Sequence, residues 1–110
     1  MVKFSFNYLG KSFNIEAKEC RSFLSQGTGL MFRKKSKPLL FLFNKKNRNS
    51  IHSFFCSDFI IVWFDGNTLI DIKYVKPWKI NIKPIKRFDK FLEIPETDIN
   101  FKKLKLLIIK

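Results

Sequence analysis

Side chains suited to chemistry are scarce in this chain, which has one histidine, His52, and two cysteines, Cys20 and Cys56, among 110 residues. The cysteines form no CxxC pair, and no second histidine or cysteine cluster lies near them to complete a zinc site. A small secreted domain would usually carry more disulfides, so two reduced, buried thiols are expected. The sequence therefore predicts no metal site and no cofactor.

Long apolar runs are also missing. The N-terminal stretch MVKFSFNYLGK lacks the apolar core of a signal peptide. No run approaches the ~18 apolar residues that a membrane span requires. We therefore expect no transmembrane segment and a cytoplasmic location.

Acidic residues are few, with 9 Asp and Glu against 22 Lys and Arg, giving a net charge of +13. Such a charge attracts polyanions, nucleic acid among them. The abundance of lysine, asparagine, isoleucine and phenylalanine is equally typical of an AT-rich genome. Lysine also far outnumbers arginine, the residue favoured for forked phosphate and base contacts. Compositional drift is thus the favoured explanation, and selected polyanion binding is the alternative.

Apolar residues make up 45% of the chain and include fourteen phenylalanines. A disordered chain needs low hydrophobicity, so this one should fold. Its length suits one core, and we predict a single domain over residues 1–110 without a linker.

Alternating apolar and polar residues predict an opening β-hairpin over residues 2–17, turned near Gly10. A short helix is expected from Lys18 to Gln26, followed by a basic loop and a central strand, LLFLF, buried on both faces. NKKNRN should form a turn. Strands are then expected at IHSFF, FIIVWF and TLIDIKYV, the last with Thr68, Ile70, Ile72 and Tyr74 on one face.

The D-G pair at Asp65 and Gly66 should turn the clearest hairpin in the chain. KPWKINIKP reads as an edge strand or an extended loop because its prolines cannot donate to a ladder. KFLEI and LKLLIIK are the last strand candidates, separated by a turn at PETDIN. About eight or nine strands and one helix predict an α+β, mainly β fold, a small antiparallel barrel-like or sandwich sheet.

Six short motifs resemble a known family in order and spacing. They are GLMFR (29–33), LLFLF (39–43), IHSFF (51–55), IIVWFDGNTLIDI (60–72), VKPW (75–78) and LEIP (92–95). The resemblance is to the uncharacterised-domain family numbered 192, also catalogued as uncharacterised protein family 0127, in the version associated with archaea. It covers roughly residues 15–100. It implies a small β-rich α+β domain with no established reaction.

Two departures from the family pattern bear on any site. The family's Pro-Ile-Asp before the central strand is replaced by SDFII, so its acidic group is lost at Ile60 or displaced to Asp58. After LEIP, the family's Ala-Gly and later Gly-Asp turn are replaced by ETDINFKKLKLLIIK, which lacks glycine. A reshaped C-terminal third is expected.

Three residues are candidates for ligand binding. His52 is expected to be a structural core histidine, with a ligand or catalytic role as the alternative. Arg33, where the resemblance places an arginine, favours a structural salt bridge over an anionic ligand. Trp78 favours core or lid packing over stacking on a base. Cys56 stands where the family has methionine and should fill space in the core.

Two basic loops, RKKSK and NKKNR, flank LLFLF and should lie at its opposite ends, which disfavours one continuous polyanion groove. Their candidate nucleic-acid contacts are Lys34, Lys35, Lys37, Lys45, Lys46 and Arg48. Asp65 favours a turn role over metal binding. The first hypothesis is a binding or accessory module with an unidentified ligand and no catalytic constellation. The alternatives are weak, sequence-nonspecific nucleic-acid binding and a small-ligand enzyme that uses His52 and Arg33.

Overall fold

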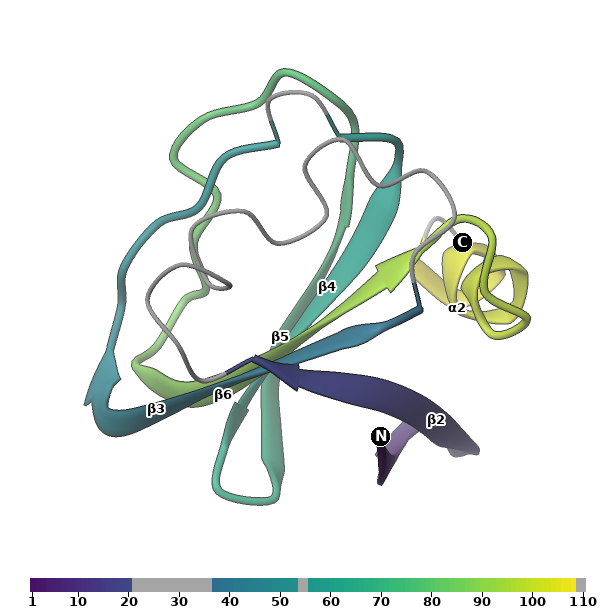
Figure 1. The fold of residues 1–110 in the computed structure, drawn as a ribbon, viewed down its shortest axis with the longest axis horizontal. Coiled ribbons are helices and arrows are strands. Elements are labelled where there is room, and N and C mark those ends of the chain that lie inside the picture. The colour runs from purple at the N-terminus through teal and green to yellow at the C-terminus, as the bar shows by residue number, and fades with distance from the viewer. Residues whose placement is uncertain (21–36, 54–55, 109–110) are drawn as a thin grey trace.

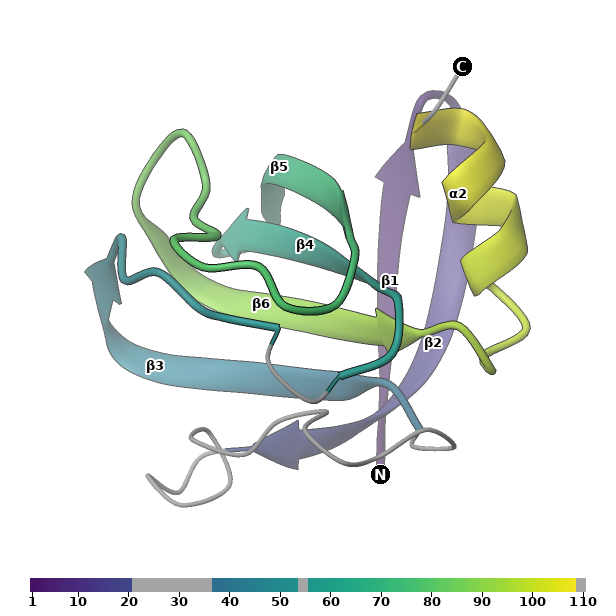
Figure 2. The ribbon, with the colours of Figure 1, turned by 90° about the horizontal axis from the view of Figure 1, so that it is seen from above.

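A six-stranded, strongly curled sheet dominates the fold. The computed structural model describes residues 1–20, 37–53 and 56–108. Its elements are β1 (Val2–Tyr8), β2 (Lys11–Cys20), β3 (Leu39–Asn47), β4 (Phe59–Asp65), β5 (Thr68–Val75), β6 (Phe88–Pro95) and α2 (Phe101–Ile108). The strand order is β1-β2-β3-β6-β4-β5, and Figures 1 and 2 show the sheet curving into a barrel-like shape. The predicted mainly β, barrel-like fold with one short helix is confirmed in this form. The sheet is mixed, because β2 and β3 pair in parallel.

The N-terminal hairpin is confirmed. Its two-residue loop, Leu9 and Gly10, has φ values of 50° and 78°, the pair of positive angles that a type I′ turn needs. Phe6 of β1 and Phe13 and Ile15 of β2 are buried, as the alternation predicted. The rings of Phe4 and Phe6 meet Phe64 of β4 at centroid distances of 4.8 and 5.6 Å, so the hairpin closes over the sheet.

The helix predicted from Lys18 to Gln26 is wrong at its start. Lys18, Glu19 and Cys20 continue β2 and pair in parallel with β3. Residues 21–26 lie outside the described residues, as does the GLMFR motif. The parallel ladder gives the backbone of these three residues hydrogen-bond partners that a sequence pattern alone does not reveal.

Strand β3 is central, as predicted, and Leu39, Leu40 and Phe41 are buried. It is longer than predicted, since pairing with β6 continues through an irregularity to Asn47. The polar turn expected at NKKNRN is wrong, because residues 44–47 belong to β3 and the next three residues run on without a turn to the Ile51 bridge. Lys45 and Lys46 belong to a strand end, where a bulge keeps their side chains exposed.

The β4–β5 hairpin is confirmed, with Gly66 at φ 60° in its turn. The prediction that Thr68, Ile70, Ile72 and Tyr74 share one face is wrong at Ile70. The register shifts between Trp63 and Phe64, so one extra residue on β5 reverses the alternation. Ile70 consequently packs against a different cluster from Ile72 and Tyr74.

The C-terminal segment LKLLIIK was predicted as a strand, but its described part, residues 104–108, belongs to α2 instead. Phe101 and Leu104 are buried and Leu107 and Ile108 are partly buried, at helical spacing. The KFLEI strand and the turn at PETDIN are confirmed. The strand predicted at IHSFF is wrong at residues 51–53, where Ile51 makes an isolated bridge to Ile82 and no strand forms; residues 54–55 lie outside the described part.

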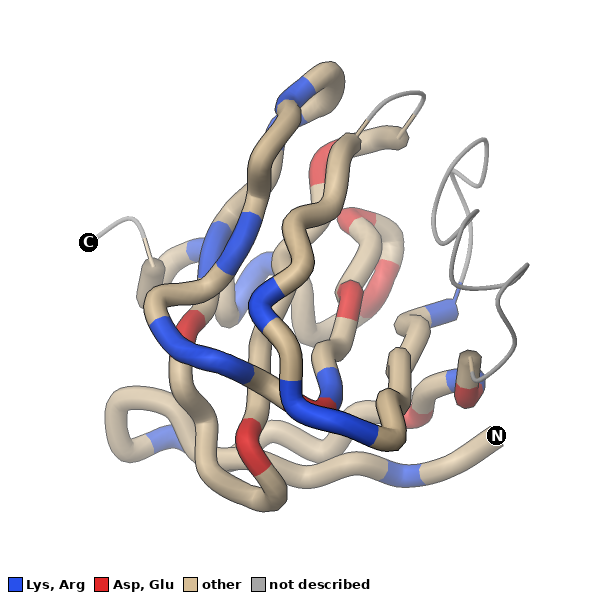
Figure 3. Tube along the Cα trace, turned by 90° about the vertical axis from the view of Figure 1, so that its left-hand side faces the viewer, with Lys and Arg blue, Asp and Glu red and all other residues tan. Residues whose placement is uncertain are grey.

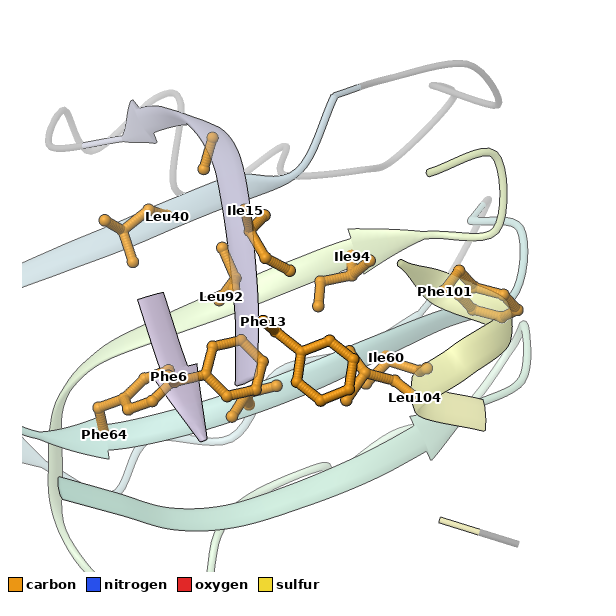
Figure 4. Close-up of a cluster of buried hydrophobic side chains, with 12 residues drawn as sticks. Phe6, Phe13, Ile15, Leu40, Ile60, Phe64, Leu92, Ile94, Phe101 and Leu104 are labelled. Carbon is orange, nitrogen blue, oxygen red and sulfur yellow. The ribbon is translucent and has the colours of Figure 1, made fainter. Parts of the chain in front are cut away.

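Two apolar clusters lie on the two faces of the sheet. Figure 4 shows the first, where the hairpin residues Phe6 and Phe13 and the α2 residue Leu104 cover the inner side of the sheet. The second contains Phe41, Trp63 and other side chains of the opposite face. Among the described residues, no helix is long and apolar enough to cross a membrane.

Candidate anion-binding surface

Two extended segments, far apart in sequence, lie side by side and carry most of the exposed positive charge on one side of the molecule. One is the end of β3 with the chain to residue 53, and the other is the connection from β5 to β6, residues 76–87. Ile51 and Ile82 exchange backbone hydrogen bonds of 2.8 and 3.0 Å, and Arg48 Nε donates to the Pro84 carbonyl at 2.8 Å. Figure 3 shows the Lys and Arg positions gathered along both segments.

We call this surface the basic face. Its members are Lys45, Lys46, Arg48, Lys73, Lys76, Lys79, Lys83, Lys86 and Arg87, all exposed except the partly buried Lys73. No Asp or Glu occurs between residues 72 and 88. The two segments thus present eight basic side chains, and β5 adds Lys73, with little opposing charge on the same segments.

The nearby carboxylates are engaged by structural contacts. Asp65 pairs with Lys46 at 3.0 Å. Asp71 accepts hydrogen bonds from the backbone N–H groups of Ile72 and Ile85, at 2.9 and 3.1 Å. These bonds fix the β5–β6 connection, and they leave most of the basic face without a neutralising partner on the same segments.

Ser53 anchors the connection. This side chain is fully buried, and its Oγ donates to the Lys76 carbonyl and accepts from the Lys79 N–H, both at 2.7 Å. Its backbone N–H donates to the Lys79 carbonyl, and its own carbonyl accepts from the N–H groups of Trp78 and Cys56. Sequence reasoning missed Ser53, because nothing in IHSFF marks its hydroxyl as buried.

The anchored backbone holds two residues in the left-handed region. Trp78 has φ 64° and Asn81 has φ 56°. For a bulky residue such as tryptophan this conformation is uncommon and persists only where the surroundings enforce it. The bonds to Ser53 supply that enforcement at Trp78, whose side chain is 60% exposed.

An open groove runs beside these residues. Its volume is about 440 Å³, and its lining combines Lys73, Lys76 and Lys79 with apolar and amide groups from Tyr74, Val75, Ile80, Asn81 and Ile82. Lys73 Nζ donates to the Lys83 carbonyl at 2.7 Å and lies 5.7 Å from the Trp63 ring. Tyr74 donates its hydroxyl to the Asp58 carboxylate, and this hydrogen bond is the main cause that raises the pKa of Tyr74 to about 12. The groove offers an anion cationic side chains next to apolar surface.

The three predicted ligand-binding residues have different outcomes. His52 is exposed, so the core-histidine interpretation is wrong. Trp78 is exposed too, so of the predicted core or lid packing the core alternative is wrong, and lid packing stays a prediction. Both residues lie beside Ser53. His52 precedes it in the sequence, and the Trp78 N–H donates a hydrogen bond of 3.0 Å to the Ser53 carbonyl. Arg33 lies outside the described residues, so the structure does not bring it together with His52.

The predicted basic contacts are divided by β3. Lys37 is exposed just before β3, and Lys45 and Lys46 are at the other end of that strand, as the sequence predicted. Lys34 and Lys35 lie outside the described residues. The lysines of residues 73–87 were missed, although the absence of acidic residues from 72 to 88 is a signal that sequence reasoning could have used.

The face of the sheet that carries the second cluster, on which the basic face also packs, buries a carboxylate. Glu93 of β6 is 6% exposed and pairs in register with Leu39 and Ile61. Burial, with a smaller effect of the Glu93 charge, raises the pKa of the Cys56 thiol from 9.0 to about 11. Cys56 is partly buried against the second cluster, as predicted, and Cys20 is buried in that cluster. Glu93 was missed by sequence reasoning, although a charged residue within the apolar run LEIP could have indicated a buried carboxylate.

The acid missing from the family pattern has no replacement at Ile60, which is fully buried between Ile94 and Tyr74. Asp58 instead lies at the start of β4 and accepts the Tyr74 hydroxyl. Asp65 occupies the turn of the β4–β5 hairpin, as predicted. Within the described ranges, no group of three His, Cys, Asp or Glu residues is placed to hold a metal ion.

Comparison with known proteins shows that other proteins share this fold. No family model matches the chain. A UPF0127 protein of Pyrococcus horikoshii is 35% identical over 71 residues, covering 61% of this chain and 62% of that protein. The match therefore spans less than two thirds of the relative's length.

Two crystal structures share the fold at low sequence identity. A protein of unknown function from Novosphingobium aromaticivorans has a TM-score of 0.80 at 17% identity, covering 99% of this chain and 79% of that one. A putative transcription regulator from Sinorhizobium meliloti has a TM-score of 0.75 at 15% identity, covering 96% and 84%. At these identities the likeness concerns the fold alone.

Proposed function

We propose that the chain is a single-domain binding or accessory module of uncharacterised protein family 0127, in its archaeal version, and that it works in the cytoplasm. Two observations support the membership. The six motifs occur in family order, and a protein that bears the family name is 35% identical over 71 residues. The fold shared with a crystal structure of a protein of unknown function agrees with a domain that has no established reaction.

The ligand that the geometry favours is a polyanion bound at the basic face. The observation that carries this proposal is the pairing of residues 45–53 with residues 76–87, which brings eight basic side chains together beside Lys73 of β5. Because lysine predominates over arginine there, binding should depend on charge more than on sequence. Weak, nonspecific binding of nucleic acid would be one form of this function.

Salt dependence tests the proposal. Affinity for heparin and for a mixed-sequence single-stranded RNA should be measured at 50 and 200 mM salt. About four phosphate contacts on a single strand predict a fall of about fiftyfold in RNA affinity over this range. A fall of less than about threefold would show that the basic face does not bind through its charge.

A matched pair of variants locates the binding. K79Q/K83Q removes two charges from the basic face and spares the backbone bonds of both residues. K102Q/K103Q removes the same charge from exposed positions on α2. Only the first should weaken binding and reduce the salt slope for RNA, by about 1.4. Equal effects would mean that net charge, and not this surface, is responsible.

A further inference from the structure

Three large apolar side chains are exposed on the same connection that carries most of the basic face. Trp78 is 60%, Ile80 64% and Ile85 67% exposed. They alternate with the cationic residues Lys76, Lys79, Lys83, Lys86 and Arg87. In Figures 1 and 2 this connection lies at the far side of the molecule from α2. Exposed apolar groups interleaved with cations are costly in water unless a partner covers them.

We propose that residues 76–87 dock on an anionic lipid surface, with Trp78 and Ile80 entering the boundary between headgroups and acyl chains. The inference rests on the proposed function, because it assumes that the basic face binds anions. Tryptophan is enriched at membrane interfaces, where its ring is apolar and its N–H remains hydrated. Lysines beside it are attracted to anionic headgroups and can extend their charged ends toward the phosphates.

The composition of the connection favours lipid over nucleic acid. Single-stranded nucleic acids are held by aromatic rings that stack on successive bases, and Trp78 is the one aromatic residue between positions 76 and 87. Ile80 and Ile85 cannot stack, but isoleucine is readily accommodated at the acyl boundary. Lysine, which dominates here, acts as a point charge toward phosphate and does not fork onto base edges.

The connection is also held in one conformation before any ligand arrives. Ser53 fixes the backbone of Lys76, Trp78 and Lys79 through hydrogen bonds of 2.7 to 3.0 Å. Asp71 of β5 accepts a hydrogen bond of 3.1 Å from the Ile85 N–H and so holds the connection near its other end. A segment fixed in this way loses little conformational entropy on docking, so a modest contact area is enough for binding.

Vesicle binding tests the inference. The full chain should sediment with vesicles of phosphatidylcholine and phosphatidylserine at 7:3, and not with pure phosphatidylcholine. W78S/I80S should bind the anionic vesicles about tenfold or more weakly, since two apolar side chains no longer enter the lipid. I99S, at an equally apolar position 84% exposed in the turn before α2, should bind within about twofold of wild type.

Fluorescence reports the contact directly, because the chain has two tryptophans and Trp63 is fully buried. Emission should shift to the blue with anionic vesicles, and acrylamide quenching of Trp78 should decrease. W78F should lose both changes. If wild type binds the anionic vesicles with no blue shift, its tryptophan does not enter lipid and the inference is overturned.

The remaining outcomes separate this inference from the proposed function. If W78S/I80S keeps heparin retention and loses vesicle binding, both stand. If W78S/I80S binds vesicles as wild type does, lipid insertion is wrong while anion binding stands. If W78S/I80S loses affinity for mixed-sequence RNA and not for vesicles, the apolar residues serve nucleic acid instead. Failure of wild type to bind heparin, RNA or anionic vesicles would refute both.

Discussion

Replacing Ser53 by alanine should loosen the connection that carries Trp78 and the basic lysines. The Ser53 hydroxyl is fully buried and makes two hydrogen bonds of 2.7 Å, donating to the Lys76 carbonyl and accepting from the Lys79 N–H. The substitution removes both. The backbone bonds of Ser53 to Trp78 and Lys79 remain, so the connection should keep its course and lose its rigidity.

The magnitude follows from the two lost bonds. A neutral hydrogen bond contributes about 0.5 to 1.5 kcal/mol net, so the free energy of unfolding should fall by about 1 to 3 kcal/mol. Both hydrogen bonds are only partly buried, so the net value of a hydrogen bond applies and not the larger cost of a fully buried, unpaired group. S12A is the control, because Ser12 bonds Asn7 on the surface and its loss should cost less than about 0.5 kcal/mol.

Urea unfolding followed by tryptophan fluorescence measures the free energy of unfolding. Amide hydrogen exchange measures the rigidity of the connection. The Lys79 N–H loses its acceptor in S53A and should exchange faster, whereas the Trp78 N–H keeps the Ser53 carbonyl. Vesicle and heparin affinity should fall with the loss of rigidity. An S53A variant with wild-type stability and unchanged Lys79 protection would refute the anchoring role.

Three further predictions concern the framework. Leu104→Ala should lower the free energy of unfolding by about 2 to 5 kcal/mol, because the Leu104 side chain is fully buried on the inner face of α2. Leu106→Ala, at a position 55% exposed, should lower it by less than about 0.5 kcal/mol, and equal urea midpoints for the two variants would contradict this packing. Gly66→Ala should cost about 1 to 2 kcal/mol through its φ of 60° alone, since a Cβ there meets no atom within 4 Å, and an unchanged midpoint would contradict the turn geometry. Because the pKa of Cys56 is raised from 9.0 to about 11, its alkylation at pH 8 should be about a hundredfold slower in the folded chain than in urea. Mass spectrometry of the alkylated peptide checks this rate, and equal rates in the folded and unfolded chain would refute the prediction. Because the folded state favours the neutral thiol, the contribution of Cys56 to stability is complete below pH 9 and is lost as the pH rises toward 11.

Elements whose signals are local could be predicted from the sequence. The first hairpin combines strict alternation with Gly10, and the β4–β5 hairpin has a D-G turn between apolar runs. Both are confirmed. The run LKLLIIK was not predictable in this way, because seven apolar and basic residues fit either period. Burial of Phe101 and Leu104 against the first cluster selected the helix.

The candidate site was less predictable than the fold. His52 was expected in the core because its neighbours are apolar, yet Ile51 pairs with Ile82 and leaves His52 exposed. Glu93 shows the converse, a carboxylate inside an apolar strand that the sheet buries. In both cases the segment that pairs with the residue's own segment, and not the neighbours in sequence, determined whether the side chain is exposed or buried.

The sequence by itself determined the mainly β class, the two hairpins and the large positive charge, since each depends on residues that are adjacent or counted without regard to position. Only the tertiary structure decided that residues 45–53 and 76–87 form one basic face. That pairing depends on the Ile51–Ile82 bridge and on the buried Ser53 hydroxyl, whose partners lie 23 and 26 residues away along the chain. Contacts at such separations leave no periodic trace in the sequence, because they form only after the sheet has brought the two segments together.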